Sequence, residues 1–398
     1  MASAARTRMA GAVRSAAPVC AFAALPSAGL VNGALYAPLL FGLGVVLAAA
    51  LWVADAARPR ADGALLLLAV LFVALGWASI AWSVAPAESA RRALQLTAIA
   101  AASLLLLAVP PPEGAAVERL FAVMLGTLAI GALAMVGDRA LGYPLQHLIA
   151  AKAAYPVTKY NRGLDYLALL VWPMLACGAA ARRRPREMLL AATLALLVAA
   201  AGKSTTAPAA LLVGAACYGL AVRTPRWGTR LVAASVTLMA VTLPVWLRMA
   251  AQHRALLVGH IKMSGLHRLE IWDYMTARVA ERPLFGWGLA AANAVPIHPA
   301  ELASYRFVVP QGVYPHQQWL ELWLELGVVG ALLALALALL ALGRIARLPP
   351  GTAAFALAAF AAALAVSFSN FEITTDSWWA ALAGTAFLMR AAARREAA

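Results

Sequence analysis

Long apolar runs alternate with short polar connections along almost the whole chain, and their lengths predict membrane-spanning helices. A helix that crosses a bilayer needs roughly 20 mostly apolar residues. Several runs are short for a straight crossing, and the run at 188–202 is the weakest. We predict twelve spans, at residues 16–31, 36–54, 63–82, 92–109, 120–136, 163–180, 188–202, 205–222, 231–247, 320–342, 352–369 and 374–389.

The segment 248–319 departs from this pattern because it mixes polar and apolar residues between two spans. Within it, apolar residues recur at helical spacing from Leu266 to Val279 and predict an amphipathic helix over 264–282, lying along the membrane surface. The segment is too short for a separate domain. We therefore expect one integral-membrane domain over 1–398, an all-α polytopic membrane protein of about twelve transmembrane helices, with the 248–319 loop and its short helices packed on the helix ends.

The composition agrees with a membrane protein and excludes a soluble one. Of 398 residues, 64% are hydrophobic and 12% are charged, which is more apolar sequence than a soluble domain needs. The net charge of +15 could suggest nucleic acid, but in membrane proteins Lys and Arg mainly set orientation. We expect membrane lipids, and no nucleic acid, as partners. Cys20, Cys177 and Cys217 lie in apolar runs and predict packing rather than a disulfide or zinc site.

The basic residues of the short connections predict the orientation. Arginines gather at both termini and in alternate connections, most densely at Arg182, Arg183, Arg184 and Arg186, whereas the other short connections hold few. The positive-inside rule therefore places both termini in the cytoplasm and residues 248–319 outside, in the periplasm of a Gram-negative host.

Ionisable residues near the spans gather at their predicted outer ends rather than at mid-span. A transporter would place such groups near the midplane, so this pattern favours a reaction chamber at the outer membrane boundary. Arginine binds phosphate bidentately, and a lipid-linked diphosphate lies at this depth. The alternative is that each residue holds a lipid headgroup or pairs with a nearby carboxylate. The candidate substrate-binding residues are the basic Arg91, Arg92, Arg162, Lys203, Arg268 and Arg282, together with the acidic Glu321 and Glu325 at the start of the tenth predicted span.

His316 differs from the other five histidines in its setting. It follows Tyr314-Pro315 at the predicted start of a helix, where proline is favoured. Histidine titrates near neutrality and can take a proton from an attacking hydroxyl. The alternative is an ordinary interfacial histidine, and both remain open on this evidence alone.

No metal-ligand spacing, glycine-rich phosphate loop or serine nucleophile motif is visible in the sequence. These absences favour metal-free chemistry on an already activated donor, with no cofactor.

Several motifs together resemble the O-antigen ligase/polymerase family. They are NRG at 161–163, GKS at 202–204, RLEIW at 268–272, ERPLFGWG at 281–288 and PHQQWLELWLELGVVG at 315–330, with WSVAPAESARRAL at 82–94 as the early outer loop. The resemblance covers most of the chain and is most specific between RLEIW and His316. It implies an integral glycosyltransferase of the GT-C type in the bacterial inner membrane.

The resemblance also implies roles for residues. Arg162 and Arg268 would bind the diphosphate of an undecaprenyl-diphosphate-linked glycan, and His316 would activate the acceptor hydroxyl. The expected reaction is inverting, metal-independent O-antigen ligation, with lipid A–core as the acceptor. The alternative within the family is an O-antigen or exopolysaccharide polymerase, whose acceptor is a second lipid-linked glycan. A polysaccharide or solute transporter, or a non-catalytic scaffold, remains the alternative from another class.

Overall fold

The computed structural model describes residues 2–54, 61–149, 159–253, 256, 260, 263–296, 298–302, 305 and 314–398. In this part of the chain the regular elements are helices, which confirms the all-α polytopic membrane fold. The helices are α1 (Ala2–Ala24), α2 (Tyr36–Val53), α3 (Gly63–Ala78), α4 (Pro86–Ala108), α5 (Ala115–Ala140), α6 (Pro144–Ile149), α7 (Lys159–Ala180), α8 (Pro185–Ala201), α9 (Thr206–Arg223), α10 (Pro225–Gln252), α11 (Met263–Glu281), α12 (Pro299–Leu302), α13 (Gln318–Ile345), α14 (Pro350–Ser367) and α15 (Asp376–Ala397).

Each of the twelve predicted spans coincides with one long helix. Proline opens α4, α8, α10 and α14, because its fixed φ suits the first helical position and its missing N–H is not needed there. The early start of α4 at Pro86 places Arg91 and Arg92 inside the helix. The amphipathic helix predicted over 264–282 is α11.

Ten helices in the described part of the chain are long and apolar enough to cross a membrane, and α8 and α15 are not among them. The 17 residues of α8 span only about 25 Å, and α15 carries three arginines near its end.

Contacts at both ends of α8 and α15 nevertheless show that each traverses the bundle. Beside α8, Arg183 donates to the carbonyl of Glu118 and Ser204 donates to Asp165. Before α15, Asn370 reaches the same Asp165, and near its end Arg395 pairs with Glu118. We call the end with Asp165, residues 202–205 and residues 370–375 the site end of the bundle.

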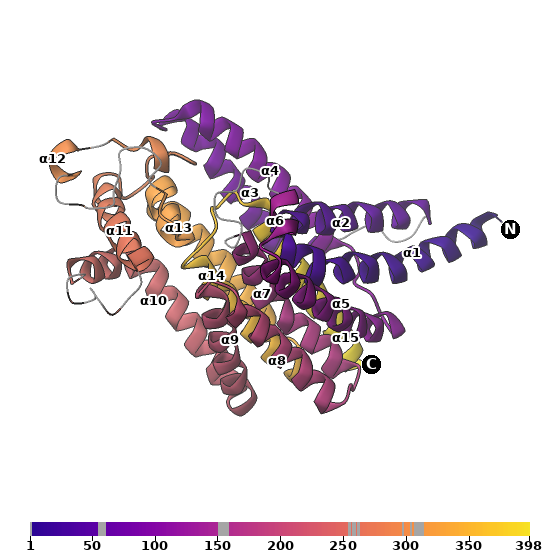
Figure 1. Ribbon diagram of the computed structural model, residues 1–398. Coiled ribbons are helices and arrows are strands. Elements are labelled where there is room, and N and C mark those ends of the chain that lie inside the picture. Colours follow the sequence, from indigo (N-terminus) through magenta and orange to yellow (C-terminus); the bar gives the residue numbers. More distant parts are fainter. Residues whose placement is uncertain are drawn as a thin grey trace.

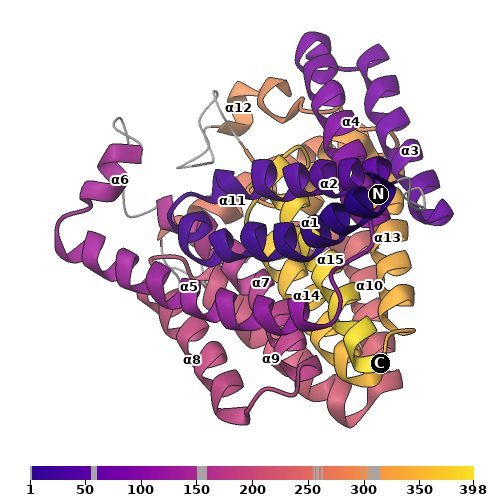
Figure 2. The same cartoon turned by 90° about the vertical axis from the view of Figure 1, so that its right-hand side faces the viewer.

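The helix α7 forms the centre of the bundle. Nearly all of its side chains are buried, and it packs against α5, α8, α9, α14 and α15. The views in Figures 1 and 2 place α7 and α14 inside the bundle, with α11 and α12 together at one end of it. A polar residue at the end of α7 is therefore held by neighbours on several sides.

The helix α13 is broken near its start. The single predicted span at 320–342 implied a continuous helix instead. Gly327 has φ 64° and ψ −161°, a conformation that favours glycine. In a regular helix the N–H groups of Val328 and Val329 would bond the carbonyls of Leu324 and Glu325. These four groups need other partners within a membrane protein.

The motif around Gly286-Trp287-Gly288 supplies those partners. We call residues 283–292 the strap. The N–H groups of Trp287 and Gly288 donate to the carbonyls of Leu324 and Glu325, and the carbonyls of Pro283 and Leu284 accept from Val328 and Val329. A Cβ at Gly327 would overlap the backbone of Leu284, so the close approach requires glycine.

Candidate functional site

His316 is held just ahead of α13 by the helix α11. The indole N–H of Trp272 in α11 donates to the carbonyl of Pro315 at 2.7 Å. The ring of His316 lies edge to face against Tyr314, with centroids 4.8 Å apart. Its φ of 52° is uncommon for a residue with a side chain. The helix begins two residues later, at Gln318, with Gln317 as its N-cap.

The surroundings of His316 favour its neutral form. Burial lowers the pKa of His316 to about 4, and the positive charge of Arg268 and the neighbouring His267 act in the same direction. At neutral pH the imidazole is therefore unprotonated, the form that a general base requires.

A buried carboxylate, Asp165, joins the two arginines that the sequence analysis assigned to the diphosphate. Asp165 is fully buried in α7 and accepts hydrogen bonds from Asn370 at 2.8 Å and from Ser204 at 3.5 Å. It interacts electrostatically with Arg268 and Arg162. Burial lowers the pKa of Arg268, and Asp165 opposes that effect, so Asp165 helps to keep the guanidinium charged.

Electrostatic interactions thus link Asp165 to Arg268 and Arg162, and Arg268 in turn to His316. Asp165 was not among the candidate residues of the sequence analysis. The sequence signal that could have identified Asp165 is its position in NRGLD (161–165), three residues after Arg162, at one end of the buried helix α7.

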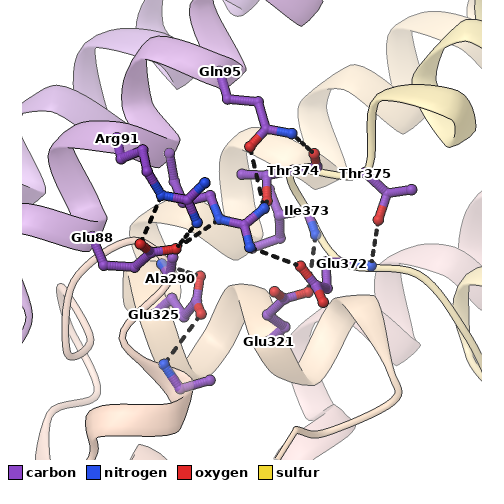
Figure 3. A network of polar contacts seen from close by, with 12 residues as sticks. Glu88, Arg91, Gln95, Ala290, Glu321, Glu325, Glu372, Ile373, Thr374 and Thr375 are labelled. Carbon is purple, nitrogen blue, oxygen red and sulfur yellow. Dashed lines mark hydrogen bonds and ion pairs between the residues drawn. The ribbon is translucent and has the colours of Figure 1, made fainter. Parts of the chain in front are cut away.

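Arg91 and Arg92 belong to a second, neighbouring network (Figure 3), in which both guanidiniums bind Glu88. Arg92 continues to the hydroxyl of Thr374 at 3.1 Å and to Glu372 at 3.7 Å. Because Arg92 links α4 to the connection before α15, its contacts fix the position of that connection. Apart from its ion pair with Glu88, the side chain of Arg91 is exposed.

Glu321 and Glu325 are buried, and both accept hydrogen bonds from the backbone. Glu321 accepts from the N–H of Ile373 at 2.9 Å. Glu325 accepts from Ala290 in the strap at 2.7 Å and from Ala292 at 3.3 Å. The two side chains therefore tether two different loops to the short first part of α13 (Figure 3).

Arg282 and Lys203 lie at the edges of this arrangement. Arg282 stacks on Trp287 with its guanidinium carbon 4.1 Å from the ring centroid and donates to the carbonyl of Trp82 at 3.3 Å. Lys203 is exposed and lines an open pocket of about 700 Å³ with Ser204, Pro208 and Leu212. Ser204 connects this pocket to Asp165.

A search of the described ranges for metal-binding groups finds no set of three His, Cys, Asp or Glu placed to hold an ion.

Comparison with known proteins finds a family similarity in the second half of the chain. A family model described as O-antigen ligase matches residues 189–335. This part of the chain is similar to the O-antigen ligase family.

Curated relatives carry names that agree with the O-antigen ligase family. A Rickettsia conorii protein named putative polysaccharide ligase is 34% identical over 76 residues, which are 19% of this chain and 18% of the relative. A protein of the same name from Rickettsia felis is 32% identical over 76 residues, 19% of each chain. The matched segment thus spans about a fifth of these relatives.

The match to the O-antigen ligase model runs from α8 into α13. It contains Lys203, Arg268, Arg282, His316, Glu321 and Glu325, whereas Arg91, Arg92 and Arg162 lie before it.

Proposed function

We propose that this protein transfers a glycan from an undecaprenyl-diphosphate-linked donor to an acceptor on the periplasmic face of the bacterial inner membrane. The acceptor that we propose is lipid A–core, which makes the reaction O-antigen ligation. One observation carries the proposal: an imidazole held unprotonated lies within electrostatic reach of Arg268, whose guanidinium suits a diphosphate.

In the proposed reaction the oxygen of an acceptor hydroxyl attacks the anomeric carbon of the donor glycan. The bond from that carbon to the diphosphate oxygen breaks, and its electron pair leaves with undecaprenyl diphosphate. The hydroxyl proton passes to His316. Attack from the face opposite the diphosphate inverts the anomeric configuration, and the reaction needs no metal or cofactor.

Arg268 and Arg162 hold the diphosphate in this scheme and neutralise the charge that develops on it. Preorganised donors of this kind stabilise the transition state because they need not reorient during the reaction. Asp165 attracts the two arginines electrostatically. Lys203 at the pocket edge, and Arg91 and Arg92 in the neighbouring network, would bind further anionic groups of the substrates. Arg282, Glu321 and Glu325 act on the substrates indirectly, through the strap and the connection before α15.

A transfer assay with purified protein in detergent tests the function. The protein receives a lipid-diphosphate-linked glycan together with lipid A–core or a second lipid-linked glycan. Capping of lipid A–core supports the ligase, and a growing ladder on the lipid carrier would instead identify a polymerase. Protein that transfers nothing here but moves the glycan across sealed vesicles would be a transporter.

The proposed orientation predicts that the segment just after the strap and the arginine-rich connection after α7 label from opposite sides. We choose Ala294→Cys, which is exposed, and Ala181→Cys, which is half-exposed, in a background lacking Cys20, Cys177 and Cys217. A membrane-impermeant maleimide should label Ala294→Cys in intact cells and Ala181→Cys only after lysis. The reverse pattern would place the site on the cytoplasmic side and exclude the proposed periplasmic substrates.

A further inference from the structure

Two buried polar atoms flank His316 without a hydrogen-bond partner among the described residues. They are the hydroxyl of Tyr314 and the side-chain amide nitrogen of Gln317. Most buried polar groups in native proteins are paired, and leaving one unpaired is costly. Two unpaired donors within two residues of a proposed catalytic base therefore require an explanation.

The amide of Gln317 is fixed in direction. Its oxygen accepts a hydrogen bond from the N–H of Leu320 and caps α13. The residue is fully buried. Because the oxygen is committed to the helix, the –NH₂ group is left as a donor without a described partner.

The hydroxyl of Tyr314 is a neutral donor in surroundings that disfavour an anion. Burial raises the pKa of Tyr314; Glu321, Glu372 and Glu325 raise it further, and Arg162 opposes them. The phenol is therefore neutral, and like the neutral amide of Gln317 it can donate a hydrogen bond. A neutral ligand rich in oxygen atoms fits this pair of donors.

We propose that Tyr314 and Gln317 bind the acceptor sugar by donating hydrogen bonds to its oxygen atoms, on either side of the hydroxyl that His316 deprotonates. This inference rests on the proposed function. Both donors are shielded from solvent, so the sugar reaches them as residues 314–317 shift. The left-handed backbone of His316 stores strain between the two donors, which such a shift would relieve.

Tyr314→Phe tests the inference because it removes one donor and retains the shape of the side chain. Gln317→Met removes the other donor without adding a charge; it also removes the oxygen that caps α13, so its melting temperature is measured beside its kinetics. In the transfer assay we expect KM for the acceptor to rise about fivefold in each variant, with KM for the donor glycan unchanged. The melting temperature of Tyr314→Phe should stay equal or rise, because the variant removes an unpaired buried group.

Thr385→Val is the matched control, because the hydroxyl of Thr385 is also buried and unpaired but lies far along α15 from Asp376. It should leave both KM values unchanged. Unchanged acceptor KM in the Tyr314 and Gln317 variants would overturn the inference and leave the proposed function standing. A changed donor KM would assign the two residues to the donor instead. Wild-type protein that transfers no glycan would refute the proposed function itself.

Discussion

His316→Ala should slow glycan transfer by about 10²–10⁴-fold, the usual contribution of a general base, while binding of the lipid-linked donor stays near the wild-type value. The donor is held by Arg268 and Arg162 in the proposed scheme, so losing the imidazole removes proton transfer and not the diphosphate site. Single-turnover rates with lipid A–core, together with donor binding measured separately, distinguish these two effects.

The pH dependence of the wild-type enzyme gives a second check on His316. Protonation would remove its ability to accept a proton, and its pKa is lowered to about 4. Wild-type kcat/KM should therefore fall only as pH drops through about 4, provided that circular dichroism shows the protein folded. His253→Ala, an exposed histidine bonded to the carbonyl of Met249, should transfer normally. An active His316→Ala variant would eliminate the imidazole as the base.

Arg268→Lys should lower kcat for transfer by about 10²-fold, a loss typical of removing one preorganised donor from a developing anion. Lysine keeps the positive charge but loses the planar fork that binds two phosphate oxygens at once. Lysine also loses its proton more readily when buried, and Arg268 lies in a site where burial lowers its own pKa. Initial rates at saturating donor and acceptor measure this change.

Arg248→Lys serves as the matched control because Arg248 is exposed on α10 and outside the group around Asp165. It should retain wild-type turnover. The melting temperature of Arg268→Lys must remain near that of the wild type for the comparison to hold. Near-normal turnover in a folded Arg268→Lys protein would exclude Arg268 from the diphosphate site.

Features that arise from local sequence were predictable. Runs of apolar residues located the twelve helices that match the predicted spans, including the short α8, because hydropathy follows directly from composition along the chain. Helical spacing identified α11, and Pro315 indicated a helix start near His316. The helix itself begins three residues later because Gln317, and not Pro315, caps it.

Features that depend on contacts between distant backbone atoms were not predictable. The break at Gly327 is stable only because the strap, about forty residues earlier, bonds the four freed groups, and backbone hydrogen bonds leave no periodic pattern in the side chains. Asp165 was similar: its position in NRGLD was visible, but its contacts with Asn370 and Ser204 come from connections far along the chain. The sequence likewise placed Glu321 and Glu325 at the site end without indicating that they bind loop N–H groups.

The break in α13 also divides the helix into a membrane-spanning part and a short first part that is bonded to loops. Residues after Gly327 form the part of the helix suited to the bilayer interior, and such helices tilt when the hydrocarbon thickness changes. Residues before Gly327 are held by Glu321 and Glu325 to loops at the site end. The strap bonds backbone groups on both sides of Gly327, so a tilt of the membrane-spanning part would be transmitted through the strap to the residues that follow His316.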